Sequence, residues 1–345
     1  MIEHSRPTLG KAEMERLRSV LDSGYISEGK YVKCLESELR DYIGAGFSIA
    51  TNCGTSALHL LLLCLNVSKG DKVILPSYVC SSVLNSIMYV GAEPVICDIE
   101  ADSFNLSLQD VKKKINDETK AVILPYIFGC PAPVDKFLEL GIPIVEDCAQ
   151  GLGASYNGRR LGGFGCASIF SFYATKVITT GQGGMILTNS KKISDKARDL
   201  IEYDNRHNYI TRYNYKMTDI QAALGLAQFS RLGSFIRRRK QIAKFYDKLL
   251  SKCGILIPLK DPGHIYYRYV IRIKPNQGRF IQRLTKKGIE AKPAVFRPLH
   301  RYLGLSKKSF PNSEEVFKTT VSLPIYPGLS DKQAGYIAEA VMDSL

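Results

Sequence analysis

A series of short apolar runs constrains the fold of this chain most strongly. The runs lie at residues 72–76, 93–98, 121–125, 142–147 and 168–172, each bounded by Gly, Pro or Asp. Longer stretches with helical periodicity separate them. Because the runs have strand length and the intervening stretches have the period of amphipathic helices, the pattern predicts an α/β fold with a mainly parallel central sheet covered by helices.

The pattern changes near residue 240. A helix is followed there by a strand-like segment at 265–273, a helix near 278–287 and a final helix. Ser330 and Gln333 form a capping-box signature at the start of the final helix. We therefore predict a large α/β domain over residues 1–239 and a smaller α+β domain over residues 240–345, to which the N-terminal arm contributes.

Charge and hydropathy narrow the set of partners. The net charge is +14, which favours anionic partners such as phosphorylated metabolites. The densest basic run, residues 237–240, lies in a helical pattern without a nucleic-acid-binding motif, so we expect a solvated helix face and no nucleic-acid partner. The first ten residues contain no signal-peptide core, and the longest apolar stretch, 58–67, is too short to span a bilayer. We expect a cytoplasmic protein without a membrane partner.

The cysteines are typical of a reducing compartment. There are nine, an odd number, and no pair has the C-x-x-C spacing. Most lie in apolar surroundings. We expect reduced, buried thiols and no metal site.

Three short motifs carry chemistry. In the first, residues 51–58, a strand-like segment ends in a small-residue turn before an apolar helix, where backbone N–H groups and the hydroxyls of Thr55 and Ser56 can hold a phosphate. The alternative is an ordinary helix cap. In the second, residues 143–150, an apolar strand carries Asp147 at its end, where open α/β sheets bind ligands. That acid could serve a metal, a ribose or a heterocyclic nitrogen, or cap a helix.

The third motif, residues 168–176, leads into the glycine-rich segment 179–184. Lys176 follows an apolar strand there. A lysine in a partly dry position can act as an imine-forming amine, whereas the simpler interpretation is an exposed turn lysine.

Together these motifs resemble the DegT/DnrJ/EryC1/StrS family of sugar aminotransferases, which are fold type I enzymes that use pyridoxal 5'-phosphate. The resemblance covers nearly the whole chain. The matching segments are residues 23–29, 54–58, 75–78, 89–95, 146–150, 170–176, 213–223 and 323–327. Their joint order and spacing are highly specific, although no single segment is.

The resemblance implies roles for particular residues. Lys176 would carry the cofactor as a Schiff base and move a proton between the substrate carbon and the cofactor. Asp147 would pair with the protonated pyridine nitrogen, and Gln150 would lie near the ring hydroxyl. Asn214 would reach the cofactor phosphate of a neighbouring subunit, which implies a homodimer with shared active sites. The phosphate would be held within the chain by Gly54, Thr55, Ser56 and Ser171.

Three positions depart from the family pattern. Cys80 occupies the place of an aromatic residue that often stacks on the pyridine ring, so Tyr78 or another residue could stack instead. Tyr126 replaces the usual histidine, and Gln182 replaces an acidic residue of the glycine loop. These changes suggest altered substrate handling.

The implied reaction transfers an amino group from glutamate or glutamine to a keto sugar. We expect a nucleotide-linked 4-keto or 3-keto deoxysugar, used in cell-surface polysaccharide or amino-sugar biosynthesis. A pyrophosphate needs cations or N–H donors, and a sugar or base can pack on a tyrosine. Candidates for these contacts are Tyr25, Arg268, Arg297 and His300, which could equally be solvated surface groups.

Three alternatives remain at this level. The substrate could be a free cyclitol or a keto-sugar acid. A sugar dehydratase of the same family is disfavoured because such enzymes have histidine where this chain has Lys176. A non-catalytic sensor with the same fold is disfavoured because pure binding does not require both Lys176 and Asp147.

Overall fold

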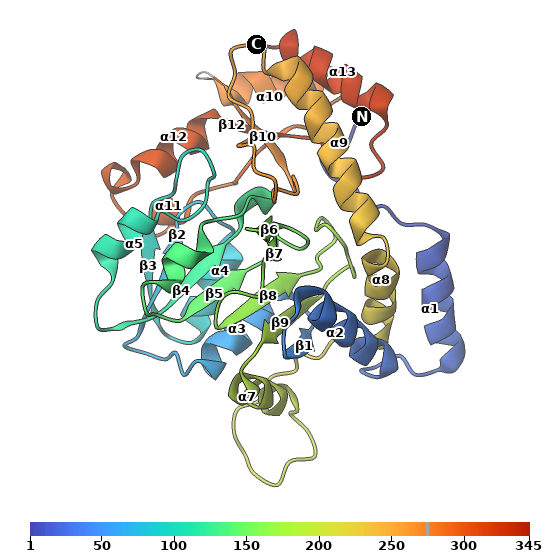
Figure 1. Cartoon of the computed structure of the whole chain (residues 1–345), viewed down its shortest axis with the longest axis vertical. Coiled ribbons are helices and arrows are strands. Elements are labelled where there is room, and N and C mark those ends of the chain that lie inside the picture. Colours follow the sequence, from blue (N-terminus) through green and yellow to red (C-terminus); the bar gives the residue numbers. More distant parts are fainter. Residues whose placement is uncertain (274–275) are drawn as a thin grey trace.

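A seven-stranded sheet forms the centre of the larger part of the molecule (Figure 1). In this computed structural model, residues 1–273 and 276–345 are described. The strands are β1 (Phe47–Thr51), β2 (Lys72–Pro76), β3 (Glu93–Cys97), β4 (Thr119–Pro125), β5 (Ile144–Asp147), β8 (Ala167–Ser171) and β9 (Gly184–Thr188). Their order is β1-β9-β8-β5-β4-β2-β3, and only the pairings of β9 with β1 and β8 are antiparallel. The predicted mainly parallel sheet is therefore present, and all five apolar runs form strands within it.

Both faces of this sheet are buried under helices. In β2, Val73 and Leu75 pack in one hydrophobic cluster and Ile74 packs in the other, as the two-residue period of a strand requires. Helices α3 (Gly54–Cys64), α4 (Ser81–Tyr89) and α7 (Lys191–Ile201) pack in the first cluster. The second cluster includes α2 (Lys30–Ile43), α5 (Leu108–Lys114), α6 (Val134–Leu138) and α8 (Asp219–Phe229).

A smaller part is built on a three-stranded antiparallel sheet in the order β10-β12-β11. These strands are β10 (Tyr269–Arg272), β11 (Lys292–Pro293) and β12 (Thr320–Leu323). The helices α9 (Leu232–Leu250), α10 (Gln277–Lys286) and α13 (Asp331–Met342) pack with this sheet in a third hydrophobic cluster. Residue Ile2 of the N-terminal arm (residues 1–10) pairs with Ile289, so the arm lies against this part.

The remaining elements are short or join the two parts. They are α1 (Lys11–Ser23), β6 (Ser155–Tyr156), β7 (Arg159–Arg160), α11 (Leu299–Tyr302) and α12 (Pro311–Thr319), with 3-10 turns at Ile127–Gly129 and Lys307–Ser309. Helix α9 runs from α8 of the larger part into the smaller part (Figure 1). The predicted domain boundary at 239–240 falls inside this helix and stays a prediction.

Two local predictions for the C-terminal region can be compared with the structure. The Ser330 side chain accepts from the Gln333 N–H and the Gln333 side chain accepts from the Ser330 N–H, so the predicted capping box is confirmed. The strand predicted over 265–273 is shorter and begins at Tyr269. Its first residues cannot be extended because Tyr266 has φ +52°, in the left-handed region.

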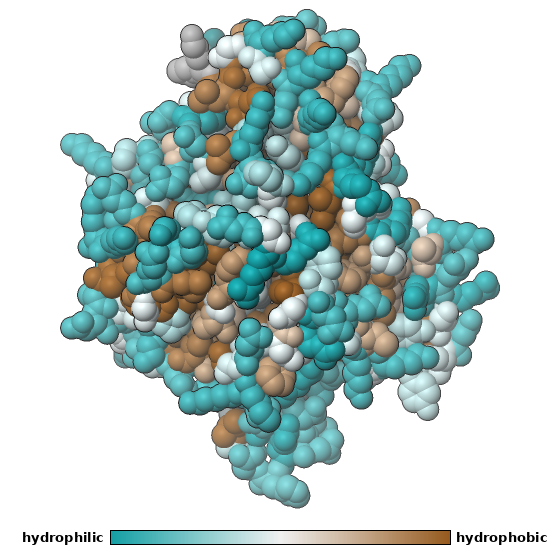
Figure 2. All heavy atoms as spheres, viewed as in Figure 1, coloured by the Kyte–Doolittle hydropathy of each residue, from teal (hydrophilic) through white to brown (hydrophobic). Residues whose placement is uncertain are grey.

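Two further sequence expectations concern the surface and the thiols. Among the described residues, no helix has the length and hydropathy needed to cross a membrane. The face shown in Figure 2 is covered mostly by hydrophilic side chains. All nine cysteines are free thiols.

Candidate active site

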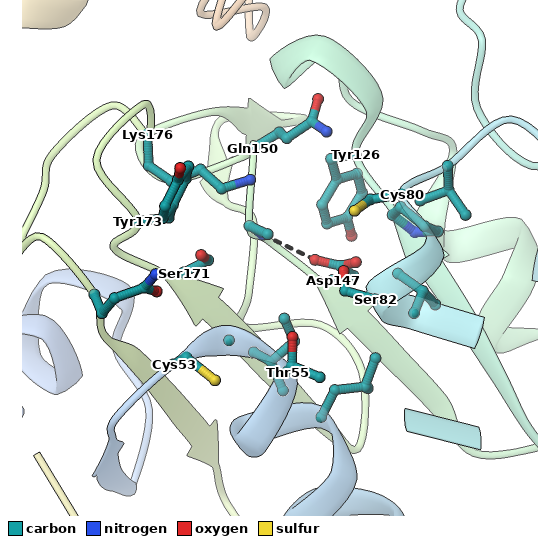
Figure 3. A pocket seen from close by; sticks show the side chains of 18 residues that line it. Cys53, Thr55, Cys80, Ser82, Tyr126, Asp147, Gln150, Ser171, Tyr173 and Lys176 are labelled. Carbon is teal, nitrogen blue, oxygen red and sulfur yellow. Dashed lines mark hydrogen bonds between the residues drawn. The ribbon is translucent and has the colours of Figure 1, made fainter. Parts of the chain in front are cut away.

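A cavity of about 240 Å³ opens at the carboxyl ends of β4, β5 and β8, where the N-termini of α3 and α4 meet them. Open parallel sheets bind ligands at this edge. Figure 3 shows the side chains that line this cavity. The cavity is lined by Cys53, Gly54, Thr55, Leu58, Val79, Cys80, Ser82, Val83, Pro125, Tyr126, Asp147, Ala149, Gln150, Ile169, Ser171, Tyr173, Lys176 and Gln182.

The start of α3 forms an anion cradle at one side of the cavity. Within residues 1–273 and 276–345, the N–H groups of Gly54 and Thr55 and the hydroxyls of Thr55 and Ser171 have no protein hydrogen-bond partner. Unpaired N–H groups at a helix start carry partial positive charge and bind anions. This set of donors suits a phosphate group.

Two glycines let the backbone close around this cradle. A Cβ on Gly54 would lie 2.8 Å from the Cβ of Ser171, and a Cβ on Gly184 would lie 2.4 Å from the carbonyl oxygen of Cys53. Both contacts are shorter than real Cβ atoms make. The β1–α3 turn can therefore lie directly against the ends of β8 and β9 only with glycine at these positions.

Ser56, which we also expected at the phosphate, has a different position. Its N–H donates to the Cys53 sulfur at 3.4 Å, and its hydroxyl lies 3.2 Å from the same sulfur. Ser56 is buried and does not line the cavity. Its contacts belong to the cap of α3, which was the alternative interpretation of this turn.

Asp147 is the last residue of β5 and is buried at the base of the cavity. One carboxylate oxygen accepts the Ala149 N–H at 2.9 Å. Burial raises the pKa of Asp147, while the Ala149 hydrogen bond and the charge of Lys176 oppose that rise. No helix begins after this strand in the described structure, so Asp147 is not a helix cap. A cation bound against it would stabilise its ionised form.

Lys176 lies in the turn after β8, where its N–H donates to the Tyr173 carbonyl at 2.8 Å. The residue is half-buried, and its amine has no hydrogen bond or ion pair with any residue that the structure describes. Figure 3 shows the Lys176 amine and the Asp147 carboxylate directed into the same space. The two predicted catalytic residues are thus brought together from the ends of neighbouring strands.

The residue before Asp147 is a buried carboxylate behind the cavity that sequence reasoning missed. Glu146 accepts the Tyr126 hydroxyl at 2.6 Å and the Gly162 N–H at 2.7 Å. It also accepts the N–H groups of Phe164 and Gly165. Because neighbouring strand residues point to opposite faces, Glu146 holds the 162–165 loop while Asp147 faces the cavity. The signal that could have identified Glu146 was its position next to Asp147 in the sequence.

Gln150 and Cys80 contribute to two other walls. The Gln150 side-chain oxygen accepts the Phe128 N–H at 2.7 Å, which orients its amide at the cavity. Cys80 lines the cavity, whereas Tyr78 is fully buried and bonds to the Thr320 hydroxyl at 2.7 Å. Cys80 therefore has access to the cavity, whereas Tyr78, which we expected could stack on the ring, is not part of its lining.

The residues expected to contact a substrate do not line the cavity. Arg268 bonds to His4 at 3.0 Å, and Arg297 bonds to the Arg301 carbonyl at 3.1 Å. Tyr25 is exposed beyond the end of α1.

His300 is fully buried, 2.6 Å from the Ser77 hydroxyl and 2.9 Å from a Glu314 oxygen. The contact with Ser77 joins elements more than 200 residues apart in the chain, which no local motif indicates.

Asn214 also lies outside the cavity of its own chain. Its carbonyl accepts the Asn52 side-chain amide at 3.2 Å, at the base of a segment between α7 and α8. That segment projects from the larger part of the molecule (Figure 1). Tyr209 within it is 94% exposed.

The cavity fits pyridoxal phosphate in three respects. The cradle at Gly54, Thr55 and Ser171 provides unpaired donors for a phosphate. Asp147 offers a buried carboxylate for a protonated ring nitrogen, and Lys176 offers an unpaired amine for an aldehyde. Each group that the cofactor presents thus has a residue of matching chemistry in one cavity.

Comparison with known proteins agrees with this geometry. The model of the DegT/DnrJ/EryC1/StrS aminotransferase family matches residues 7–342. The chain is 35% identical to GDP-perosamine synthase of Escherichia coli O157:H7, over 97% of this chain and 96% of that protein. It is 32% identical to the spore coat polysaccharide biosynthesis protein SpsC of Bacillus subtilis, over 99% of this chain and 96% of that protein.

Solved structures show the same architecture. The protein Spr1654 of Streptococcus pneumoniae, in its PLP-form, superposes with a TM-score of 0.93 at 28% sequence identity, over 99% of this chain and 97% of that one. Its PMP-form matches equally well. The similarity confirms the predicted fold class, and it agrees with the predicted cofactor.

Proposed function

The chain belongs to the DegT/DnrJ/EryC1/StrS aminotransferase family, and from this premise we propose that it transfers an amino group from glutamate or glutamine to a nucleotide-linked keto sugar. The enzyme is a pyridoxal-phosphate-dependent transaminase. The observation that carries the proposal is the single cavity in which Lys176 and Asp147 face one space beside an anion cradle. The substrate class follows from the relatives, one of which is named for GDP-perosamine.

Six residues of the cavity have a part in this reaction. When bound, pyridoxal phosphate supplies an electron sink for the substrate bond that breaks. The cradle at Gly54, Thr55 and Ser171 binds the phosphate and fixes the ring. Asp147 holds a proton at the ring nitrogen, and the Gln150 amide orients the ring hydroxyl. The Lys176 amine would hold the cofactor through its aldehyde and would move the proton at the substrate carbon.

We propose that the nucleotide part of the substrate binds outside this cavity, in a site completed by a second copy of the chain. The cavity with Lys176 and Asp147 has a volume of about 240 Å³, which suits the cofactor and a sugar ring. The cationic candidates Arg268 and Arg297 lie outside the lining of this cavity. The projecting segment with Asn214 carries exposed apolar side chains, Tyr209 and Ile210, as a subunit contact requires. A homodimer would place Asn214 at the partner's phosphate cradle.

The relatives and the cysteines also indicate a cellular setting. The relatives named above include a protein of spore coat polysaccharide biosynthesis, so we place this enzyme in polysaccharide or amino-sugar biosynthesis. Nine free thiols favour a reducing compartment, and we propose the cytoplasm.

The discriminating experiment compares a nucleotide-linked keto sugar with the same sugar lacking its nucleotide. The amine form of the enzyme is mixed with each, and return of the yellow absorbance of the aldehyde form is followed. If charge-assisted hydrogen bonds hold the pyrophosphate, its loss lowers efficiency about a hundredfold or more. GDP, UDP or dTDP then competes with the substrate, more weakly at high salt. Equal efficiency with the free sugar, and no nucleotide inhibition, favours a cyclitol or free-sugar substrate instead.

A further inference from the structure

A buried tyrosine from the smaller part of the molecule contacts the lysine of the active site. Tyr267 precedes β10 and is 5% exposed. The Lys176 amine lies over its ring, 5.4 Å from the ring centroid. The Tyr267 hydroxyl lies 3.4 Å from the hydroxyl of Thr175, the residue before Lys176. No sequence motif singled out this tyrosine, because it is about 90 residues from Lys176 in the chain.

Cations surround Tyr267 on several sides. The Arg268 guanidinium carbon lies 5.3 Å from the ring centroid, and Arg239 of α9 donates to the Tyr267 carbonyl at 3.0 Å. Arg239 is itself buried and bonds only to backbone carbonyls. In the parts of the chain that the structure describes, none of Lys176, Arg239 and Arg268 forms an ion pair with a carboxylate.

Three other titratable groups lie near this cluster, and among the described residues none of them forms an ion pair with Lys176, Arg239 or Arg268. His4 of the N-terminal arm contacts Arg268, and burial lowers the pKa of His4 to about 3, so its ring is neutral at physiological pH. Glu290 accepts the His4 backbone N–H at 2.9 Å and forms an ion pair with Lys292. Asp147 faces Lys176 from the cavity. The phenol of Tyr267 is therefore the ionisable acid placed among the three cations.

The charges around the phenol favour its ionised form. Burial alone would raise the pKa of Tyr267, but the charges of Lys176 and Arg268, with smaller effects of Thr175 and Arg239, lower it to about 8. The pKa of the neighbouring Tyr266 is shifted in the other direction, because burial and the charge of Asp247 raise it to about 12.

We propose that Tyr267 is a positioning residue for Lys176, which holds the lysine amine over its ring beside the cavity. The ring attracts the ammonium through its negative face, and the phenolate adds a full negative charge. The proposal rests on the proposed role of Lys176 and adds a second residue that positions its amine.

The first test uses the cofactor-free protein and needs no substrate. Tyrosine ionisation is followed by ultraviolet absorbance as the pH is raised. We expect one tyrosine to ionise near pH 8 in the wild type. That step disappears in Tyr267→Phe and remains in the matched control Tyr266→Phe, whose hydroxyl ionises far higher. In Lys176→Met the step moves to higher pH, by about one unit or more, because a cation has been removed.

The second test measures how fast pyridoxal phosphate attaches to the cofactor-free protein at different pH values. Attachment requires the uncharged amine. Tyr267→Phe keeps the ring but removes the phenolate, so the change in attachment rate that accompanies ionisation of Tyr267 near pH 8 is lost in this variant. Tyr266→Phe keeps the wild-type profile.

Four outcomes would overturn the proposal. One is a wild-type protein in which no tyrosine ionises below the usual range. Another is a low step that survives in Tyr267→Phe, or an attachment profile that this variant leaves unchanged. If Tyr267→Phe does not fold, an identical tyrosine titration in Lys176→Met and wild type overturns it. Because the titration is made without substrate or cofactor, it can fail or succeed whichever sugar the enzyme uses.

Discussion

At Asp147, burial of the carboxylate lowers the stability of the protein, whereas the proposed reaction requires that same buried carboxylate. The carboxyl is buried at the end of β5, and this burial raises its pKa above the value of 3.8 that an exposed aspartate has. The folded cofactor-free protein therefore holds the proton more tightly than the unfolded chain does. Its stability falls as the pH rises through this range, and the ionised carboxylate lowers stability at neutral pH. The same carboxylate is what a protonated ring nitrogen requires.

Asp147→Asn should separate these two effects. We expect the cofactor-free variant to melt at a higher temperature than the wild type near pH 7, with a difference that fades as the pH falls below the raised pKa. Amino transfer should slow by about two orders of magnitude, because the ring nitrogen loses its anionic partner. Calorimetry of the cofactor-free proteins and single-turnover kinetics measure the two effects. Unchanged turnover would assign the carboxylate another task.

At the same scale, sequence reasoning worked where a residue's environment is local. Lys176, Asp147, Gln150 and the cradle could be placed because each follows a strand or begins a helix within its own motif. Tyr267 could not, because its contact with Lys176 joins distant segments. His4, which bonds to Arg268, and Ser77, which bonds to His300, are likewise distant in the chain, at more than 200 residues.

Among the elements, the β1–α3 turn controls the phosphate cradle. Gly184 of β9 leaves no space for a side chain, since a Cβ there would meet the Cys53 carbonyl at 2.4 Å. Gly184→Ala should push the start of α3 away from Ser171, weaken pyridoxal phosphate binding about tenfold or more, and lower stability by about 1–3 kcal/mol.

Gly278→Ala is the matched control for this change, because a Cβ at Gly278 meets nothing within 4 Å. It should leave cofactor affinity unchanged and stability within about 1 kcal/mol of wild type. Equilibrium titration with the cofactor and thermal unfolding test both variants. Equal cofactor affinity in the two would show that the cradle does not depend on this close approach.

The elements of the central sheet were predictable because their apolar runs and bounding turns are local features. All five predicted runs form strands with bounds that differ by at most a few residues. The position of β9 was not predictable: it pairs antiparallel with β1 and β8, and both pairings are decided by contacts across the sheet. In the smaller part, the apolar pattern predicts a strand from residue 265, but the positive φ of Tyr266 interrupts the extended backbone, and β10 begins only at Tyr269.

For the whole molecule, the proposed homodimer gives the sharpest prediction. A Lys176→Ala chain lacks the amine, and an Asn214→Ala chain lacks the residue that we propose to reach the partner's phosphate cradle. Mixing the two inactive chains should restore up to about one quarter of wild-type activity, because one site of each hybrid dimer would contain both residues. Native mass spectrometry confirms subunit exchange. Full exchange without recovered activity would argue against a shared site.

The proposed reaction requires covalent attachment of the cofactor to one lysine. Lys176 is assigned by its place after β8, its unpaired amine and its common space with Asp147. Reduction of the yellow enzyme with borohydride, followed by digestion and mass spectrometry of the peptides, tests that assignment directly. The predicted result is one pyridoxyl group for each chain, on the peptide that contains Lys176. A label on any other lysine, or no label on an enzyme that still transfers amino groups, would contradict it.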